Sequence, residues 1–184
     1  PTTRVLHGKY VRAHRVFQSP KGSIDLGVVD DADGGALVVI KEAYAHTMED
    51  LAGRDARARL RDEARCLTAV GPAGIAPTLT DYWEEAGSSF LVYTPIPGST
   101  LATLISKLAV QGLRPPLNLL RSWTASLCAA VAQLHAMGYV SCDIKPSNIV
   151  VTADGLRLID LELAGPATTE PTGGMGTPGY CSPQ

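Results

Sequence analysis

The chain has 184 residues, enough for one large domain or two small lobes, and its 45% share of hydrophobic residues is ordinary for a globular protein. A formal net charge of −2 leaves no basic surplus, which argues against nucleic acid as an obligate partner. The four cysteines are widely spaced, and no apolar run approaches the length of a bilayer span, so we expect free thiols, a cytoplasmic location and no membrane partner.

The first half of the sequence predicts strands and one helix. Clustered or alternating apolar side chains predict five strands, over residues 10–18, 24–29, 36–40, 78–83 and 89–94. The third of these strands is expected to end at Lys41. Residues 55–70 follow a helical pattern, and the glycines and proline of residues 71–74 are expected to end that helix.

The second half predicts helices followed by a β-hairpin. Residues 95–98 contain two prolines and are expected to form a stiff connector. Apolar side chains at helical spacing then predict a helix over residues 101–108 and a longer one that ends at Gly138. Two apolar segments flank Asp154 and Gly155, which predicts the hairpin, and residues 165–184 show no helical signal. The predicted fold class is therefore α+β, with a β-rich lobe over residues 1–94, a connector over 95–98 and the first part of a helical lobe over 99–184.

Polar side chains suited to phosphoryl transfer gather after the long helix. Asp143, Lys145 and Asn148 share one short loop, and Asp160 follows the hairpin. Phosphoryl transfer requires a carboxylate that orients the attacking hydroxyl, a cation near the moving phosphate, and oxygen ligands for magnesium. We therefore predict catalytic roles for Asp143 and Lys145 and metal binding by Asn148 and Asp160. The structural alternatives are a hydrophilic turn and a plain strand terminator. The stretch resembles the catalytic and metal-binding loops of the protein-kinase fold.

The same resemblance implies a nucleotide site in the first half. Lys41 follows Val-Val-Ile, as does the kinase lysine that contacts the α- and β-phosphates, although a strand-capping lysine would look the same. That lysine needs a glutamate partner on the helix. Glu63 lies on the core-facing stripe, whereas Asp62 points elsewhere and Glu49 precedes the helix, so Glu63 is predicted.

The phosphate-covering loop is less distinct. Kinases carry Gly-x-Gly-x-x-Gly here, whereas this chain offers only Gly22 and Gly27. Counting back from Lys41 places the tip at residues 19–23, so that Gly22 and Ser23 would lie near the phosphates and Ile24 over the adenine. An ordinary glycine turn between strands is the alternative.

The connector would supply backbone groups for the base. Matching Gly98 to the kinase hinge glycine places Tyr93 at the gatekeeper position and residues 94–96 on the hinge. Thr94 and Ile96 are the predicted contacts, and Ile96 retains the N–H that the flanking prolines lack. Ordinary linker residues would be compatible with the same sequence.

Two departures from the kinase pattern concern regulation. Ser141 and Cys142 replace the His-Arg that precedes the catalytic Asp, and the missing Arg is the residue that reads a phosphorylated activation loop in many kinases. The resemblance therefore implies activity without such phosphorylation, despite four threonines, Thr168, Thr169, Thr172 and Thr177. Glu162 replaces the glycine of Asp-Phe-Gly, which argues against the conventional flip of that segment.

Within the kinase fold, several segments resemble the kinase domain of class III lanthipeptide synthetases. They are residues 39–46, 55–63, 90–92, 158–164 and 176–184. In that family the domain lies between lyase and cyclase domains of the same polypeptide and phosphorylates Ser and Thr of a leader-containing precursor peptide. The resemblance implies ATP, or another NTP, and Mg²⁺ as cofactors. A start at Pro1 and a last motif that stops at Gln184 predict a piece of a longer polypeptide.

Two other functions are compatible with the sequence. A bacterial Ser/Thr signalling kinase would share the catalytic residues, although the missing Arg and Glu162 count against it. A pseudokinase scaffold would account for the weak glycine loop and for Ser141 and Cys142. The presence of Lys41 and of all four polar catalytic residues, Asp143, Lys145, Asn148 and Asp160, counts against it.

Overall fold

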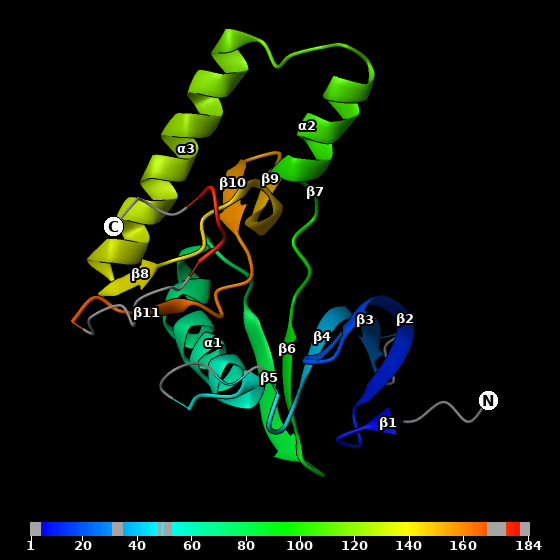
Figure 1. The fold of residues 1–184 in the computed structure, drawn as a ribbon. Helices are drawn as coiled ribbons and strands as arrows, with labels where there is room; N and C mark the ends of the chain where they lie inside the picture. The colour runs from blue at the N-terminus through cyan, green and yellow to red at the C-terminus, as the bar shows by residue number, and fades with distance from the viewer. Residues whose placement is uncertain (1–4, 31–34, 48, 50–52, 169–175, 181–184) are drawn as a thin grey trace. The chain divides into compact units, whose positions relative to one another are not determined.

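The computed structural model describes residues 5–30, 35–47, 49, 53–168 and 176–180. The chain divides into two compact units, which we describe separately. The first unit comprises residues 1–64 and 78–95, and the second comprises residues 65–77 and 96–184. Strands dominate the first unit, whereas the second contains two long helices with short strands (Figure 1). The predicted α+β class is confirmed.

The first unit is built on a six-stranded antiparallel sheet with the strand order β1-β2-β3-β4-β6-β5. Its strands are β1 (Val5–Leu6), β2 (Tyr10–Ser19), β3 (Gly22–Val29), β4 (Leu37–Tyr44), β5 (Leu79–Glu85) and β6 (Ser88–Tyr93). The five predicted strands are confirmed, and β1 is an addition. The predicted strand end at Lys41 is wrong, because β4 continues to Tyr44 by pairing with β6.

Strand alternation gives this sheet two different faces. One face carries Ile40 and the rest of a buried apolar cluster, with Leu6, Tyr10, Val38, Trp83, Phe90 and Val92. Lys41, the next residue along β4, therefore points to the opposite face. The Tyr10 ring stacks on Trp83 with 5.6 Å between centroids, although β2 and β5 are not neighbours in the sheet. The sheet must therefore curl so that these strands approach each other.

Helix α1 (Ala56–Val70) begins and ends at the predicted places. The Asp55 carboxylate accepts hydrogen bonds from the Ala58 N–H at 2.9 Å and the His46 N–H at 3.1 Å, which satisfies a helix donor and ties the preceding loop. The helix passes into the short 3₁₀ helix η1 (Gly71–Ala73), and Gly74 stops it with a left-handed φ of 70°.

The second unit contains α2 (Leu101–Val110) and α3 (Leu117–Ala136), joined by a loop (Figure 1). Its strands form two small antiparallel sheets, β10-β9-β7 and β11-β8. These strands are β7 (Ser99–Thr100), β8 (Tyr139–Ser141), β9 (Ile149–Thr152), β10 (Gly155–Leu158) and β11 (Ala164–Pro166). The predicted helices and hairpin are confirmed, but Gly155 pairs with Thr152, so the hairpin turn is Ala153-Asp154.

Close packing explains the connector glycine. A Cβ on Gly98 would lie 2.3 Å from the carbonyl oxygen of Val151, and its φ of 152° is one that other residues rarely adopt. Helix α3 supports the hairpin from the other side, where the Leu156 N–H donates to Ser126 Oγ at 2.8 Å.

Among the helices of the described residues, none combines the length and apolarity needed to span a membrane.

Truncation of the buried apolar cluster should destabilise the first unit. Ile40 is fully buried, so Ile40→Ala is expected to lower the free energy of unfolding by about 2–5 kcal/mol through lost burial and a residual cavity. Leu37→Ala in the same strand is the control, because Leu37 is 51% exposed and should cost less than about 1 kcal/mol. Urea unfolding measures both, and equal losses would contradict this description of the core.

Candidate active site

The carboxylate of Asp143 is the meeting point of three side-chain donors. Its Oδ2 accepts from Lys145 Nζ at 2.6 Å and from Asn148 Nδ2 at 3.1 Å, and its Oδ1 accepts from Thr177 Oγ1 at 2.6 Å. Lys145 Nζ also donates to Thr177 Oγ1 at 2.7 Å. The structure thus brings together three of the residues predicted for the site, and adds Thr177.

Backbone hydrogen bonds hold the loop that carries these residues. The 3₁₀ turn η2 (Pro146–Asn148) is closed by the Asn148 N–H, which donates to the Lys145 carbonyl at 2.9 Å. Asn148 Nδ2 also donates to the carbonyl of Asp143 at 3.1 Å. The Cys142 N–H donates to the carbonyl of Leu163, next to the β8–β11 pairing. Asp143 is therefore fixed from both sides.

The surroundings of Asp143 favour its charged form. Burial alone would raise the pKa of this carboxyl, but the hydrogen bonds from Lys145 and Thr177 outweigh it and hold the pKa below the ordinary value. Asp143 is therefore a carboxylate at neutral pH. It can accept a hydrogen bond from an incoming hydroxyl.

A backbone hydrogen bond of the preceding residue connects the Asp160 segment to the same loop. The N–H of its neighbour Ile159 donates to the carbonyl of Asn148 at 2.9 Å. Asp160 itself has a φ of 58°, which is uncommon for a residue with a Cβ and costs about 1 kcal/mol or more. Glu162 is not among the described residues with positive φ, so a side chain is accommodated where kinases carry glycine. The proposed lack of a flip remains a prediction.

The oxygen atoms of Asn148 and Asp160 are of the type that Mg²⁺ prefers. Because Asn148 uses its amide nitrogen on Asp143, its amide oxygen is turned away from that carboxylate, towards Ser147 Oγ at 3.3 Å. Among the described residues, no three or more His, Cys, Asp and Glu side chains form a metal-binding group. A magnesium ion held by this pair would therefore need further oxygens from phosphate and water.

The ion pair predicted for the first unit is present. Lys41 Nζ lies 2.8 Å from Glu63 Oε2 and 3.1 Å from Oε1, and the two residues are 7% and 1% exposed. The buried stripe of α1 brings Glu63 to Lys41, as its helical phase predicts. Their role towards a nucleotide remains a prediction.

The β2–β3 turn is tighter than the predicted tip at residues 19–23. Ser19 pairs with Gly22, so only Pro20 and Lys21 form the turn. A Cβ on Gly22 would lie 1.8 Å from the Glu42 carbonyl oxygen, so glycine is needed here for strand packing. Ile24 pairs with Lys41 and shares its face.

Ser23 has a different neighbour from the one its predicted role requires. Its hydroxyl is buried and donates to Asp25 Oδ2 at 3.0 Å, on the sheet face opposite Lys41. A contact from Ser23 to a nucleotide would therefore have to come from its backbone.

Thr94 and Ile96, the predicted contacts to the nucleotide base, differ in which backbone groups are available for hydrogen bonding. The Thr94 N–H donates to the Thr78 carbonyl at 3.0 Å, which leaves the Thr94 carbonyl as its available backbone group. Within the described part of the chain, the Ile96 N–H has no hydrogen-bond acceptor. Thr94 belongs to the first unit and Ile96 to the second.

Comparison with known proteins places this arrangement in a family. Residues 26–184 match the protein kinase domain. The chain belongs to the protein kinase domain family. The probable serine/threonine-protein kinase PkwA of Thermomonospora curvata is 33% identical over 157 residues, which cover 82% of the chain. The serine/threonine-protein kinase AfsK of Streptomyces griseus is 28% identical over 167 residues, or 89% of the chain, and human myotonin-protein kinase is 37% identical over 107 residues, or 55%.

These matches cover a small part of the relatives. The chain spans 20% of PkwA, 20% of AfsK and 16% of myotonin-protein kinase, about a fifth of their length. The predicted kinase fold is confirmed by the family match and by the strand-rich and helical units. The narrower likeness to lanthipeptide synthetases finds no support in these relatives, which are named as protein kinases.

Thr177 is the site residue of this kinase domain that the sequence did not reveal. The sequence marks Thr177 only as one of four threonines of the activation segment, of which Thr169 and Thr172 lie outside the described residues. Thr177 is 34 positions from Asp143, so no local spacing connects them. The available signal was its place between Gly176 and Pro178, within a segment that already resembled kinases.

The Lys41–Glu63 pair should show strong coupling in stability. Glu63→Met alone leaves a buried ammonium group without its partner and is expected to cost about 3–5 kcal/mol, whereas Lys41→Met with Glu63→Met should recover most of that loss. Glu84→Gln, which breaks the exposed pair with Arg61, is the control and should cost at most about 1 kcal/mol. A double-mutant cycle in urea measures the coupling, and additive losses would contradict a buried pair.

Thr177 should control the acidity of Asp143. Thr177→Val keeps the shape but removes the hydroxyl that lowers the pKa of Asp143, so that pKa should rise, whereas Thr177→Ser should leave it low. Carboxyl ¹³C chemical shifts followed against pH report the change directly. An Asp143 pKa that is equal in the wild type and Thr177→Val would show that the hydrogen bond is absent in solution.

Proposed function

We propose that this protein kinase domain transfers the γ-phosphoryl group of ATP to Ser or Thr hydroxyls of a protein or peptide. The observation that carries the proposal is the charged Asp143 carboxylate with Lys145, Asn148 and Thr177 arranged around it. A scaffold without catalysis would not require an ammonium and a carboxylate held 2.6 Å apart in a loop of the protein kinase family.

In the proposed reaction the acceptor oxygen forms a bond to the γ-phosphorus while the bond to the β–γ bridging oxygen breaks, and ADP leaves. Asp143 orients the acceptor hydroxyl and receives its proton as the new bond forms. Lys145 offsets negative charge on the moving phosphoryl group, and Lys41, held by Glu63, contacts the α- and β-phosphates. Asn148 and Asp160 would hold Mg²⁺, which would neutralise phosphate charge when bound.

The acceptor class that we favour is a protein Ser or Thr. PkwA and AfsK are named as serine/threonine-protein kinases, and their similarity covers more than four fifths of this chain. A lanthipeptide precursor remains a second candidate because of the segments that resemble those synthetases. Cys142 occupies the position of the phosphate-reading arginine, so we infer that transfer does not depend on a phosphorylated activation loop.

Two substitutions should separate chemistry from nucleotide binding. Asp143→Asn is expected to lower the transfer rate by about 100-fold or more while MgATP affinity changes little, because Asp143 acts on the acceptor. Asp160→Asn should weaken magnesium-dependent ATP binding as well. Asp154→Asn, at the exposed hairpin turn, is the control for a lost carboxylate.

Calorimetric titration with MgATP and a phosphate-transfer assay give the two readouts. Full transfer by Asp143→Asn, or unchanged magnesium dependence in Asp160→Asn, would contradict these roles.

The acceptor class can be tested by comparing two substrates in separate reactions. The protein is incubated with ATP and Mg²⁺ in the presence of a generic Ser/Thr protein substrate and, separately, a Ser/Thr-rich precursor peptide encoded beside its gene. Mass spectrometry then counts the added phosphate groups. Phosphate on the protein substrate alone supports the proposal, whereas phosphate on the peptide alone would favour the lanthipeptide reading.

A further inference from the structure

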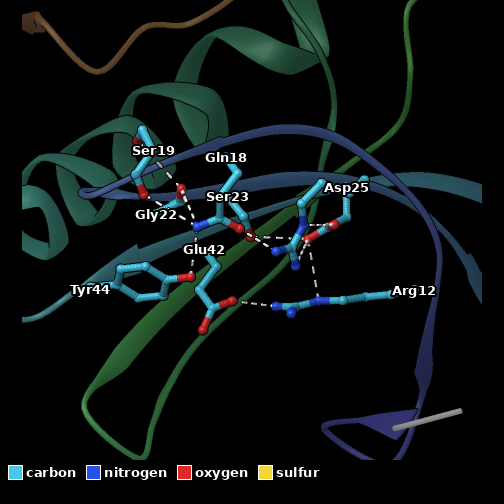
Figure 2. Close-up of polar contacts among 9 residues, drawn as sticks. Arg12, Gln18, Ser19, Gly22, Ser23, Asp25, Glu42 and Tyr44 are labelled. Carbon is cyan, nitrogen blue, oxygen red and sulfur yellow. Dashed lines mark hydrogen bonds and ion pairs between the residues drawn. The ribbon is translucent and has the colours of Figure 1, made fainter. Parts of the chain in front are cut away.

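The first unit contains a buried carboxylate that the proposed reaction does not use. Asp25 of β3 is only 2% exposed. Its Oδ1 lies 2.7 Å from Arg15 Nε, and its Oδ2 lies 3.4 Å from Arg12 Nε and 3.0 Å from Ser23 Oγ. Figure 2 shows Arg12, Ser23 and Asp25 converging in this way. Burying a carboxylate costs desolvation energy even when guanidinium groups pair with it, so stability alone does not account for this cluster.

This cluster lies on the sheet face opposite the predicted nucleotide residues. Asp25 pairs with Ile40 and Ser23 with Glu42, whereas Ile24 pairs with Lys41. Directly opposite residues in antiparallel strands share a face. The side chains of Asp25 and Glu42 therefore lie on one face of the sheet, and those of Ile24 and Lys41 lie on the other. Asp25 can therefore affect a nucleotide only through the backbone that it holds.

The cluster extends into the β2–β3 turn. The Arg15 guanidinium, fixed by Asp25, also donates to the side-chain oxygen of Gln18. Gln18 Nε2 in turn lies 3.3 Å from the Ser19 carbonyl, 3.4 Å from the Gly22 carbonyl and 3.2 Å from Tyr44 Oη (Figure 2). A chain of polar contacts thus runs from the buried carboxylate to the turn.

Hydrogen bonds within the protein also occupy the backbone carbonyl groups of the turn. The Tyr44 N–H donates to the Lys21 carbonyl at 2.9 Å, so the carbonyls of Ser19, Lys21 and Gly22 all accept hydrogen bonds from groups of the protein. A phosphate is repelled by carbonyl oxygens and attracted by N–H groups. Arg12 links the cluster to β4 as well, at 2.5 Å from Glu42 Oε2. Polar contacts therefore connect β2, β3 and β4 next to the turn.

We propose that Asp25 is a positioning residue that sets the β2–β3 turn for phosphate binding through Arg15 and Gln18. This inference rests on the proposed function, since it assigns the turn to the phosphates of ATP. A turn that has only Pro20 and Lys21 at its tip and a single glycine beside it lacks the backbone freedom of a glycine-rich loop. Its position is set instead by fixed charges.

Asp25→Asn is the primary test, because it keeps the side-chain size and removes the charge that holds both arginines. We expect the Kd for MgATP to rise about tenfold, the factor that corresponds to losing one hydrogen bond between charged groups. The transfer rate at saturating ATP should stay within about twofold, since Asp25 does not touch the reacting atoms. Amide hydrogen exchange at residues 19 and 21–23 should become faster in the absence of nucleotide.

Two further variants make the result specific. Gln18→Ala cuts the link to the turn without altering the buried carboxylate, so it should also raise the Kd for MgATP and serves as the test if Asp25→Asn does not fold. Asp81→Asn is the matched control, because Asp81 is a carboxylate of the same sheet that contacts Lys9 and Tyr10 instead. Its Kd for MgATP should equal that of the wild type.

The outcomes separate this inference from the proposed function. A wild-type protein that binds no MgATP would overturn both. A wild type that binds and transfers phosphate, with an unchanged Kd in folded Asp25→Asn or in Gln18→Ala, would overturn the positioning role alone. An equal rise in Kd for Asp81→Asn would also overturn it, because the effect would then come from general loosening of the sheet.

Discussion

The carboxylate of Asp143 accepts hydrogen bonds from three residues, and this set of hydrogen bonds ties the loop that carries Asp143, Lys145 and Asn148 to the distant Thr177. Asn148 binds it from the following 3₁₀ turn, and Thr177 binds it from far along the chain. Because the combined donors keep the carboxyl ionised despite its burial, the same contacts that fix the loop also prepare an acceptor for a hydroxyl hydrogen. Structure and proposed chemistry therefore depend on one electrostatic arrangement.

The first unit separates its charges by strand alternation. On one face of β4, Lys41 is neutralised by Glu63, which the buried stripe of α1 delivers. On the other face, Asp25 holds two arginines behind the β2–β3 turn. Since neighbouring positions in a strand point to opposite sides, the buried Lys41–Glu63 pair and the buried Asp25 carboxylate lie on different faces of the sheet. In the proposals above, the Lys41–Glu63 pair contacts the nucleotide and the Asp25 cluster holds the backbone of the turn.

The sequence predicted what local patterns encode. Apolar periodicity located the long strands and helices, and helical phase selected Glu63 over Asp62. The patterns could not show that β4 runs past Lys41, because that extension comes from pairing with distant β6. Short strands such as β8 and β11 carry too few residues for a period. Thr177 and the buried side of Ser23 depend on tertiary contacts, which no spacing along the chain reveals.

The most direct test of the account is phosphoamino acid analysis after incubation with Mg²⁺ and ATP labelled at the γ-phosphate. The account predicts label on serine or threonine of an added protein substrate, and loss of that label when Asp143 is replaced by Asn. Label that appears only as inorganic phosphate, or equal labelling by the wild type and Asp143→Asn, would contradict transfer directed by the Asp143 carboxylate.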